Sequence, residues 1–168
     1  MYSENNPNTF EKTYGMTCPM VIIPCGIPTA GKSTWVKENL IGFVSVSRDD
    51  IREQMYGKYK KIPFTKQSEQ MVTNIFDSRM SDAIARKRNI VLDNTHCKAS
   101  YLNAAIQRFS GTGYKIVVIF FDIPIWKAYF RNWKRKLQTG KWIPPHVIKQ
   151  MYKNYKKINK QDYAKYQA

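Results

Sequence analysis

A glycine-rich stretch, GIPTAGKST at residues 26–34, carries the residue types that hold a phosphate group. It fits the pattern G-x-x-x-x-G-K-[ST], with Gly31, Lys32 and Ser33 at its end. Glycines let the backbone turn successive N–H groups toward a phosphate, and the helix that follows adds its N-terminal dipole. We predict that Lys32 reaches the β- and γ-phosphates of a nucleoside triphosphate and that the Ser33 hydroxyl ligates Mg²⁺. The residues of this loop that we predict to bind the donor are Gly26, Thr29, Ala30, Gly31, Lys32, Ser33 and Thr34.

Strand-like and helix-like segments alternate around this loop from Met20 onward. Apolar strands that run continuously and alternate with helices are typical of a parallel sheet covered on both faces. We therefore predict an α/β fold with a central parallel sheet of about four strands. Residues 1–18 are expected to be a flexible extension, and 19–168 a single domain. Strands are expected at 20–25, 43–47, 89–94 and 114–122, helices at 32–40, 48–57, 65–88 and 100–109, and two basic helices on either side of 139–145.

Acidic and basic side chains follow the second expected strand. In open α/β sheets ligands bind outside the carboxyl ends of the strands. Asp49 is the first acid beyond that strand, and a carboxylate there can orient an acceptor hydroxyl and take its proton. Arg52, one helical turn later, can hold a phosphate of the acceptor or can be a solvated helix charge. Arg48 is assigned to the same acceptor side, whereas Asp50 is equally explained as a cap of the helix start.

The third expected strand ends in LDNTH, which places Asp93, Asn94 and Thr95 at the same edge of the sheet. Asp93 can hold Mg²⁺ through a water molecule or orient Thr95, or it can merely cap the next helix. We assign all three residues to the acceptor side. His96 is interpreted as a polar neighbour rather than a metal ligand. Asp122, after the fourth strand, is equally explained as a structural turn residue.

A basic segment, FRNWKRKLQTGKWIPP, begins at residue 130 and contains Gly140 as a candidate hinge. Arg131 and Arg135 are four residues apart, so their guanidinium groups share one helix face. Such a face suits a lid that closes over ATP, where an arginine offsets charge as the γ-phosphoryl group leaves. The alternative is an ordinary exposed basic helix.

The charge of the chain points to a polyanionic partner. Its 28 Lys and Arg against 12 Asp and Glu give a formal net charge of +16. From Pro124 onward twelve Lys and Arg face a single acid, Asp162, and Trp and Tyr are interleaved with them. Positive charge for phosphates combined with aromatic faces for bases is typical of binding to a nucleic-acid strand.

Three cysteines are too few and too scattered for a disulfide framework, and a reduced, buried thiol is expected at Cys25. The longest apolar runs are far too short to span a bilayer, and no secretion signal is expected at the N-terminus. We therefore expect a cytoplasmic protein, or one in the host cytoplasm if it is viral, with no membrane partner.

Six segments occur in an order that resembles the kinase domain of the bacteriophage polynucleotide 5′-kinase/3′-phosphatase family: GKSTW, SRDDIR, LDNTH, FFDIP, FRNWKR and IPPHVIKQMYK. The resemblance extends over about residues 20–155. It implies a P-loop kinase fold with a basic helical lid, in which Lys32 and Ser33 serve the nucleotide donor. The family's phosphatase motif D-x-D-x-T occurs nowhere in the chain, so 3′-phosphatase activity is not expected.

The resemblance also implies roles at the acceptor and in the lid. Asp49 corresponds to the general base that contacts the 5′-hydroxyl, and Arg52 to the arginine that grips the acceptor phosphate. Arg135 corresponds to the lid arginine that acts on the donor phosphates, with Arg131 as its neighbour. The aspartate of the third strand aligns with either Asp93 or Asn94.

Together these features predict a kinase that moves the γ-phosphate of ATP, or of another triphosphate such as GTP, to the 5′-hydroxyl of DNA or RNA in nucleic-acid repair. Lys32, Asp49 and Arg135 are its predicted catalytic residues. One alternative is a kinase of a small alcohol or nucleoside, although a small acceptor gives no reason for a charge of +16. The other is a nucleic-acid-binding module that ATP switches. The oligomeric state stays open.

Overall fold

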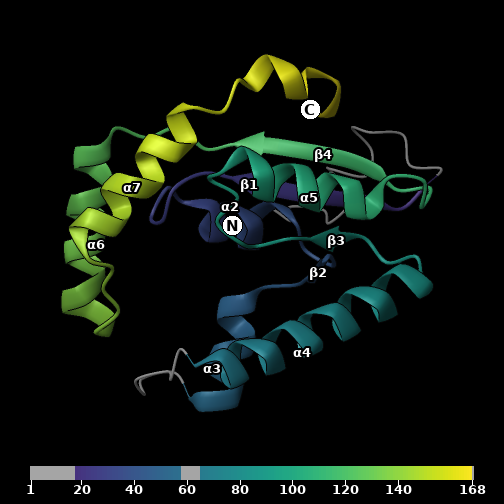
Figure 1. Ribbon diagram of the computed structural model, residues 1–168, viewed down its shortest axis with the longest axis horizontal. Coiled ribbons are helices and arrows are strands. Elements are labelled where there is room, and N and C mark those ends of the chain that lie inside the picture. The colour runs from purple at the N-terminus through teal and green to yellow at the C-terminus, as the bar shows by residue number, and fades with distance from the viewer. Residues whose placement is uncertain (1–17, 58–64, 168) are drawn as a thin grey trace, which may run out of the picture.

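Figure 1 shows the computed structural model, which describes residues 18–57 and 65–167. Four strands form one parallel sheet: β1 (Met20–Cys25), β2 (Val44–Ser45), β3 (Ile90–Val91) and β4 (Lys115–Phe120), in the order β2-β3-β1-β4. The predicted parallel sheet of about four strands is therefore confirmed, although β2 and β3 are shorter than the runs expected at 43–47 and 89–94. The predicted N-terminal extension lies outside the described residues apart from Cys18.

β1 is the centre of the sheet because it is apolar along its whole length. All six of its residues are buried, and it pairs with β4 from Met20↔Lys115 to Cys25↔Phe120. On its other side β3 pairs through Val21↔Ile90 and Ile22↔Val91. The glycine-rich loop follows directly from Cys25, so it leaves the sheet in the middle of the carboxyl edge.

Local sequence signals mark the ends of several helices. The Ser47 side chain accepts a hydrogen bond from the Asp50 amide at 3.3 Å and so caps the next helix, while Thr65 and Ser68 form a capping box. Gly140, with φ at 71°, ends the basic helix. The helices are α2 (Lys32–Asn39), α3 (Arg48–Tyr56), α4 (Lys66–Ala85), α5 (Ala99–Phe109), α6 (Ile125–Thr139) and α7 (Pro145–Lys156).

One prediction about the chain's end needs correction. Two basic helices were expected to close the chain, but a 3₁₀ helix, η1 (Lys160–Tyr166), follows α7 and packs on β4. Its segment KQDYAKY has no sustained apolar period, so the pattern gave no sign of it. The Asn159 side chain starts it by accepting a hydrogen bond from the Gln161 amide at 3.3 Å, and Tyr163 anchors it in the core.

Helices cover both faces of the sheet, as predicted (Figure 1). Met20 and Ile22 point to the face covered by α2, where they meet Val36. Val21 and Ile23 point to the opposite face and join a larger core supplied by α4, α5, α7 and η1. The alternation along β1 follows from the two-residue period of a strand. Within the described ranges, no helix is long and apolar enough to cross a bilayer.

Candidate active site

The glycine-rich loop has two residues with positive φ just before the start of α2. Gly31 has φ at 101°, and Thr29 is a β-branched residue with φ at 62°, which is rare. Contacts from α6 hold Thr29: its hydroxyl donates to the Ala128 carbonyl at 3.1 Å, and its own carbonyl accepts from Arg131 Nη1 at 3.1 Å. Gly26 leaves no room for a side chain, because a Cβ there would lie 3.0 Å from Phe121. The loop and the predicted lid helix are thus already in contact.

The Lys32 side chain is bonded to the backbone of this loop. Its side chain is buried, and Nζ donates hydrogen bonds to the carbonyls of Gly26 and Ile27, both at 2.9 Å. An ammonium group has three donors, and these two bonds fix its position at the loop's centre. Burial lowers the pKa of Lys32, and the charges of Asp93 and Asp49 act against that lowering.

Ser33 and Asp93 lie together beside Lys32. Burial raises the pKa of Asp93, whereas a hydrogen bond with Ser33 and the charge of Lys32 act to lower it. A hydroxyl and a carboxylate oxygen are the ligands that Mg²⁺ prefers, so this pair fits a magnesium ion that keeps several of its waters. The neighbouring Asn94 takes a different position: its Oδ1 accepts from the Arg48 amide at 3.1 Å and so holds the start of α3.

On α3, Arg52 is held by two carboxylates. Nη1 donates to Asp49 Oδ1 at 2.7 Å, while Nε and Nη2 donate to the two oxygens of Glu69 at 3.0 and 2.8 Å. The Asp49 side chain is 86% exposed, so its carboxylate is open to an acceptor. The hydrogen bond with Arg52 lowers the pKa of Glu69. Glu69 was not predicted: it lies seventeen residues from Arg52, on α4, and sequence alone explains it as a charge at a helix start.

The Arg48 side chain, also predicted for the acceptor side, has its partners on α4. Its Nη1 donates to Thr73 Oγ1 at 3.0 Å, and its guanidinium lies 5.1 Å from the centre of the Phe76 ring, so it packs against α4. Thr95 is half-buried in the loop that follows β3, next to Asn94. Thr34 is exposed in the first turn of α2.

The lid arginines take different positions on α6. Arg131 contacts the rim of the loop through Thr29, as described above. Arg135 Nη2 donates to Asn132 Oδ1 at 3.2 Å, while its Nε is buried without a hydrogen-bond partner. Burial lowers the pKa of Arg135, and the charge of Asp49 acts against that lowering. Arg135, predicted to act in the lid, thus has a buried Nε that is free to donate to an added anion.

Two further contacts, absent from the predictions, hold α6 and the loop that follows it. Asn132 is only 2% exposed, and its amide donates to the Ile143 carbonyl at 2.8 Å and accepts from the Ile143 amide at 3.1 Å. This pair ties the loop after α6 back onto the helix. Next to it, Lys141 forms an ion pair with Glu53 of α3, which links the lid to the acceptor side.

Other polar residues at this edge have structural partners. His96 is buried with a ring nitrogen 3.3 Å from the Pro24 carbonyl, and burial lowers its pKa to about 4, so the ring is neutral. The Cys25 thiol donates to the His96 carbonyl at 2.7 Å, and burial raises its pKa to about 12, in agreement with the expected buried thiol. Asp122 pairs with Lys160. Among the residues described, no three His, Cys, Asp or Glu side chains form a metal cluster.

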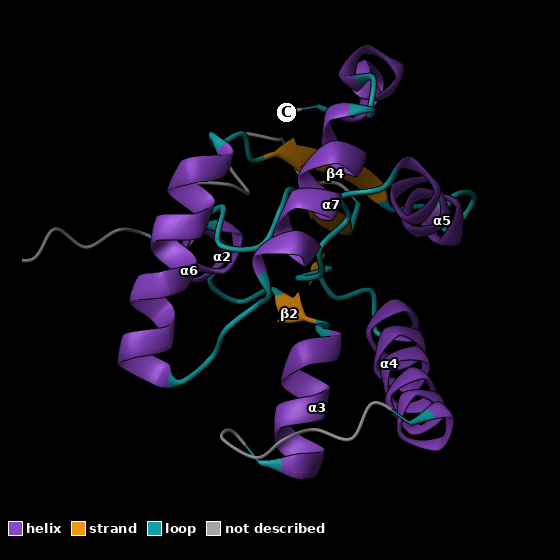
Figure 2. Ribbon diagram, turned by 60° about the vertical axis from the view of Figure 1, so that its left-hand side comes forward, coloured by secondary structure: helices purple, strands orange, loops and turns teal. Residues whose placement is uncertain are grey.

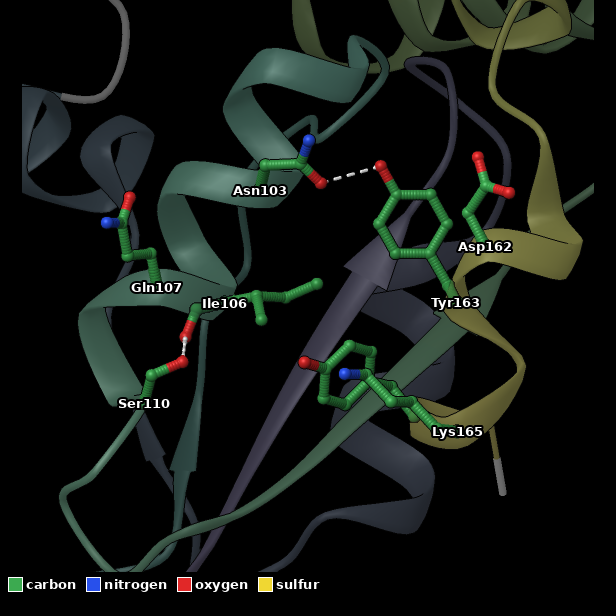
Figure 3. Close-up of a pocket in the computed structure, with 8 residues that line it drawn as sticks. Asn103, Ile106, Gln107, Ser110, Asp162, Tyr163 and Lys165 are labelled. Carbon is green, nitrogen blue, oxygen red and sulfur yellow. Dashed lines mark hydrogen bonds between the residues drawn. The ribbon is translucent and has the colours of Figure 1, made fainter.

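A hollow between α5 and η1 lies apart from this site (Figure 3). Asn103 and Ile106 line it from α5, and Tyr163 lines it from η1, where its hydroxyl donates to Asn103 Oδ1 at 2.7 Å. No residue of the glycine-rich loop, of α3 or of α6 contributes to it. The candidate active site is therefore the edge of the sheet where the loop, α3 and α6 meet.

The fold and this loop define a P-loop protein, and comparison with known proteins gives the family. A family model described as an AAA domain matches residues 21–158, so the chain belongs to that family. Membership implies a nucleotide as ligand. Over 153 residues the chain is 26% identical to a protein named as a bifunctional polynucleotide kinase/RNA ligase, from Autographa californica nuclear polyhedrosis virus. The alignment covers 85% of this chain but only 22% of that relative. It confirms the resemblance to polynucleotide kinases.

Solved structures give the same fold. A chain of the Pnkp1/Rnl/Hen1 RNA repair complex matches with a TM-score of 0.74 and 24% identity, covering 86% of this chain and 46% of that one. A protein described as a kinase from Chloroflexus aurantiacus matches with a TM-score of 0.63 and 14% identity, covering 80% and 78%. These likenesses confirm the P-loop kinase fold. The chain spans less than half the length of the first two relatives named.

Proposed function

We propose that this chain transfers the γ-phosphate of a nucleoside triphosphate to the 5′-hydroxyl of a polynucleotide. The observation that carries the proposal is the position of Asp49. Asp49 lies in the first turn of α3, which follows β2 at the carboxyl edge of the sheet. Its carboxylate accepts from Arg52 Nη1 at 2.7 Å and is 86% exposed, so it is held in place and open to an acceptor hydroxyl at the edge that also bears the donor loop.

The donor half rests on the loop and the first turn of α2. Backbone N–H groups of residues 26–34 and the Lys32 ammonium hold the β- and γ-phosphates, and the lid arginines Arg131 and Arg135 approach from α6. Ser33 and Asp93 would hold Mg²⁺, which when bound neutralises charge on the phosphate oxygens. Ser33 and Asp93 fit this ion because each offers an oxygen atom as a ligand and both lie beside Lys32.

The acceptor half is α3. An acceptor hydroxyl beside Asp49 gives its proton to that carboxylate as its oxygen bonds to the γ-phosphorus. The bond from that phosphorus to the bridging β–γ oxygen breaks, and the nucleoside diphosphate leaves with its new charge beside Arg135. Arg52 keeps the Asp49 carboxylate oriented, and Glu69 keeps Arg52 in place. A phosphate of the acceptor would compete for Arg52 with these two carboxylates.

Charge and similarity favour a polynucleotide over a small alcohol as the acceptor. A formal charge of +16 attracts a polyanion, whereas a small neutral acceptor would gain nothing from it. The viral relative carries the name polynucleotide kinase together with RNA ligase. Because ligation uses ends that carry a 5′-phosphate, such a kinase would prepare strands for repair.

Transfer of labelled γ-phosphate tests the proposal. Matched DNA and RNA oligonucleotides with 5′-hydroxyl ends, a nucleoside 3′-phosphate and a sugar acid would be compared as acceptors, with ATP and GTP as donors. We expect oligonucleotides to be preferred, and Asp49→Ala to lower the rate by roughly 10²–10⁴-fold. The control is Asp82→Asn, an exposed acid on α4 that pairs with Arg86. A wild-type rate for folded, ATP-binding Asp49→Ala would remove Asp49 as the base, and preference for the sugar acid would overturn the proposed acceptor.

A further inference from the structure

The outer side of α6 carries a row of exposed apolar side chains. Trp126 is 66% exposed, Phe130 58%, Trp133 56% and Leu137 67%. Successive members are four, three and four residues apart, which places all four on one side of the helix. We call this set the α6 aromatic face. Among the described residues eight large apolar side chains are exposed, and five lie on α6 or in the loop directly after it.

The opposite side of the same helix faces the core and the glycine-rich loop. Ala128 and Asn132 are buried there, Arg131 donates to the Thr29 carbonyl of the glycine-rich loop, and Arg135 donates to Asn132. Figure 2 shows α6 at the edge of the molecule, with α7 beside it. The α6 aromatic face therefore contributes nothing to the donor site, and a contiguous exposed patch of this kind marks a binding surface.

The borders of the α6 aromatic face are positively charged. At 100° per residue Lys127 and Lys134 lie along one side of it and Lys136 along the other, and all three are exposed. The sequence has no Asp or Glu between residues 123 and 161. Charge complementarity thus selects a partner that is anionic along its length and carries flat apolar groups. A single nucleic-acid strand has both features, because its phosphates are charged and its unpaired bases stack on aromatic rings.

The arrangement of the rings fits this partner. The Phe130 and Trp133 ring centres are 6.3 Å apart with their planes tilted by 36°, so they form a continuous aromatic surface. Lys136 Nζ lies 5.0 Å from the centre of the exposed Trp142 ring, which extends the surface beyond Gly140. Trp142 follows Lys141, whose ion pair with Glu53 joins this loop to the helix that bears Asp49. The surface is thereby connected to the acceptor side.

We propose that the α6 aromatic face binds the single strand of the acceptor polynucleotide beyond its reacting end. Bases stack on Trp126, Phe130 and Trp133, and the bordering lysines bind phosphates. The inference rests on the proposed function for the identity of the strand as acceptor, but binding of a strand to this face does not require catalysis.

A binding measurement without nucleotide tests the face itself. The probe is a fluorescent single-stranded oligonucleotide of about 12 residues with a 5′-phosphate, which cannot be phosphorylated again, titrated at two salt concentrations. Because stacking contributes about 1–3 kcal/mol per base, the variant Trp126→Ala/Trp133→Ala should raise Kd at least about tenfold. The matched control is Tyr101→Ala, a 62% exposed ring on α5 with Lys98 5.6 Å from its centre, and its Kd should stay within about twofold.

A kinetic measurement then separates the face from the chemistry. In the double variant the KM for a long acceptor should rise relative to the KM for a nucleoside 3′-phosphate, which is too short to extend from the active site to the α6 aromatic face on the other side of the helix. If the double variant binds the probe as the wild type does, or if it loses both acceptors equally, the inference is wrong. It is also wrong if light scattering shows a wild-type dimer that the variant converts to a monomer, because the face is then an interface between copies. If the wild-type chain transfers no phosphate but the double variant still loses strand binding, the proposed function is wrong. The α6 aromatic face is then still a site that binds a single strand.

Discussion

Arg52 and Glu69, seventeen residues apart on the successive helices α3 and α4, are joined by two hydrogen bonds of 3.0 and 2.8 Å. Both oxygens of Glu69 are engaged by the planar guanidinium, which leaves Nη1 directed at Asp49. A bidentate pair of this kind fixes orientation as well as charge. The position of the exposed Asp49 carboxylate thus depends on a residue of α4.

Glu69→Gln should impair the acceptor step and leave the donor site intact. The amide offers one acceptor oxygen and no charge, so the Arg52 guanidinium is no longer held in a fixed orientation. Asp49 then loses the hydrogen bond that positions its carboxylate. We expect kcat/KM for the 5′-hydroxyl acceptor to fall about tenfold, equivalent to about 1.4 kcal/mol, with the KM for nucleotide unchanged. Asp82→Asn removes an exposed ion pair on the same helix and should change neither constant. An equal loss in both constants would show that Glu69 only supports the fold.

Asp93→Asn should separate function from stability. Burial raises the pKa of this carboxyl, so the fold favours its protonated form and the charged form costs stability as pH rises through that pKa. Without metal or nucleotide the variant should therefore melt at a higher temperature than the wild type at pH 7. The difference should vanish at about pH 3, where the carboxyl is protonated in both states.

The same variant should bind Mg²⁺ more weakly when nucleotide is present. Loss of the carboxylate beside Ser33 is expected to raise the Mg²⁺ concentration needed for half-maximal phosphotransfer by roughly 10–100-fold. A magnesium titration at fixed ATP measures this shift. An unchanged requirement would show that Asp93 does not serve the metal, and Asn94→Ala then tests the neighbouring position.

Features that depend on neighbouring residues could be predicted from the sequence, and those that depend on tertiary packing could not. The phosphate loop was predictable because Gly31, Lys32 and Ser33 are adjacent and their chemistry needs only a preceding strand and a following helix. Glu69 reaches Arg52 only because α3 packs on α4. Likewise Asn132 looks like any polar residue of a basic helix until the loop after α6 folds back to it.

The same distinction explains the strands and the α6 aromatic face. β1 was predicted because a continuous apolar run indicates a strand that is buried on both faces. β2 and β3 are only two residues long each, because only Val44 and Ser45 pair with Ile90 and Val91. Aromatic residues interleaved with lysines indicated nucleic acid but not which rings are exposed. The structure buries Tyr155 and Tyr163 and leaves Trp126 and Trp133 exposed.

Gly31→Ala should abolish nucleotide binding, and Gly42→Ala is the matched control for the backbone strain that the substitution introduces. Both glycines have positive φ, 101° and 89°, so alanine at either position costs about 1–2 kcal/mol of backbone strain. Only Gly31 shapes the phosphate loop and lies near Arg131, whereas a Cβ at Gly42 meets nothing within 4 Å. Melting temperatures should fall similarly in the two variants, and calorimetry should show loss of ATP binding in Gly31→Ala alone. Equal ATP affinities in both variants would contradict the role of this loop conformation.

Asn132→Ala should loosen the lid and destabilise the fold. The change removes both hydrogen bonds to Ile143 and leaves that residue's amide and carbonyl without them in a partly buried position. A loss of about 2–3 kcal/mol in the free energy of unfolding is expected, together with faster proteolysis after Lys141. Gln138→Ala, an exposed change on the same helix, should alter neither. Since Asn132 also accepts from Arg135 at 3.2 Å, the KM for nucleotide should rise in the alanine variant. A stability loss with an unchanged KM would mean that this bond does not position the lid arginine.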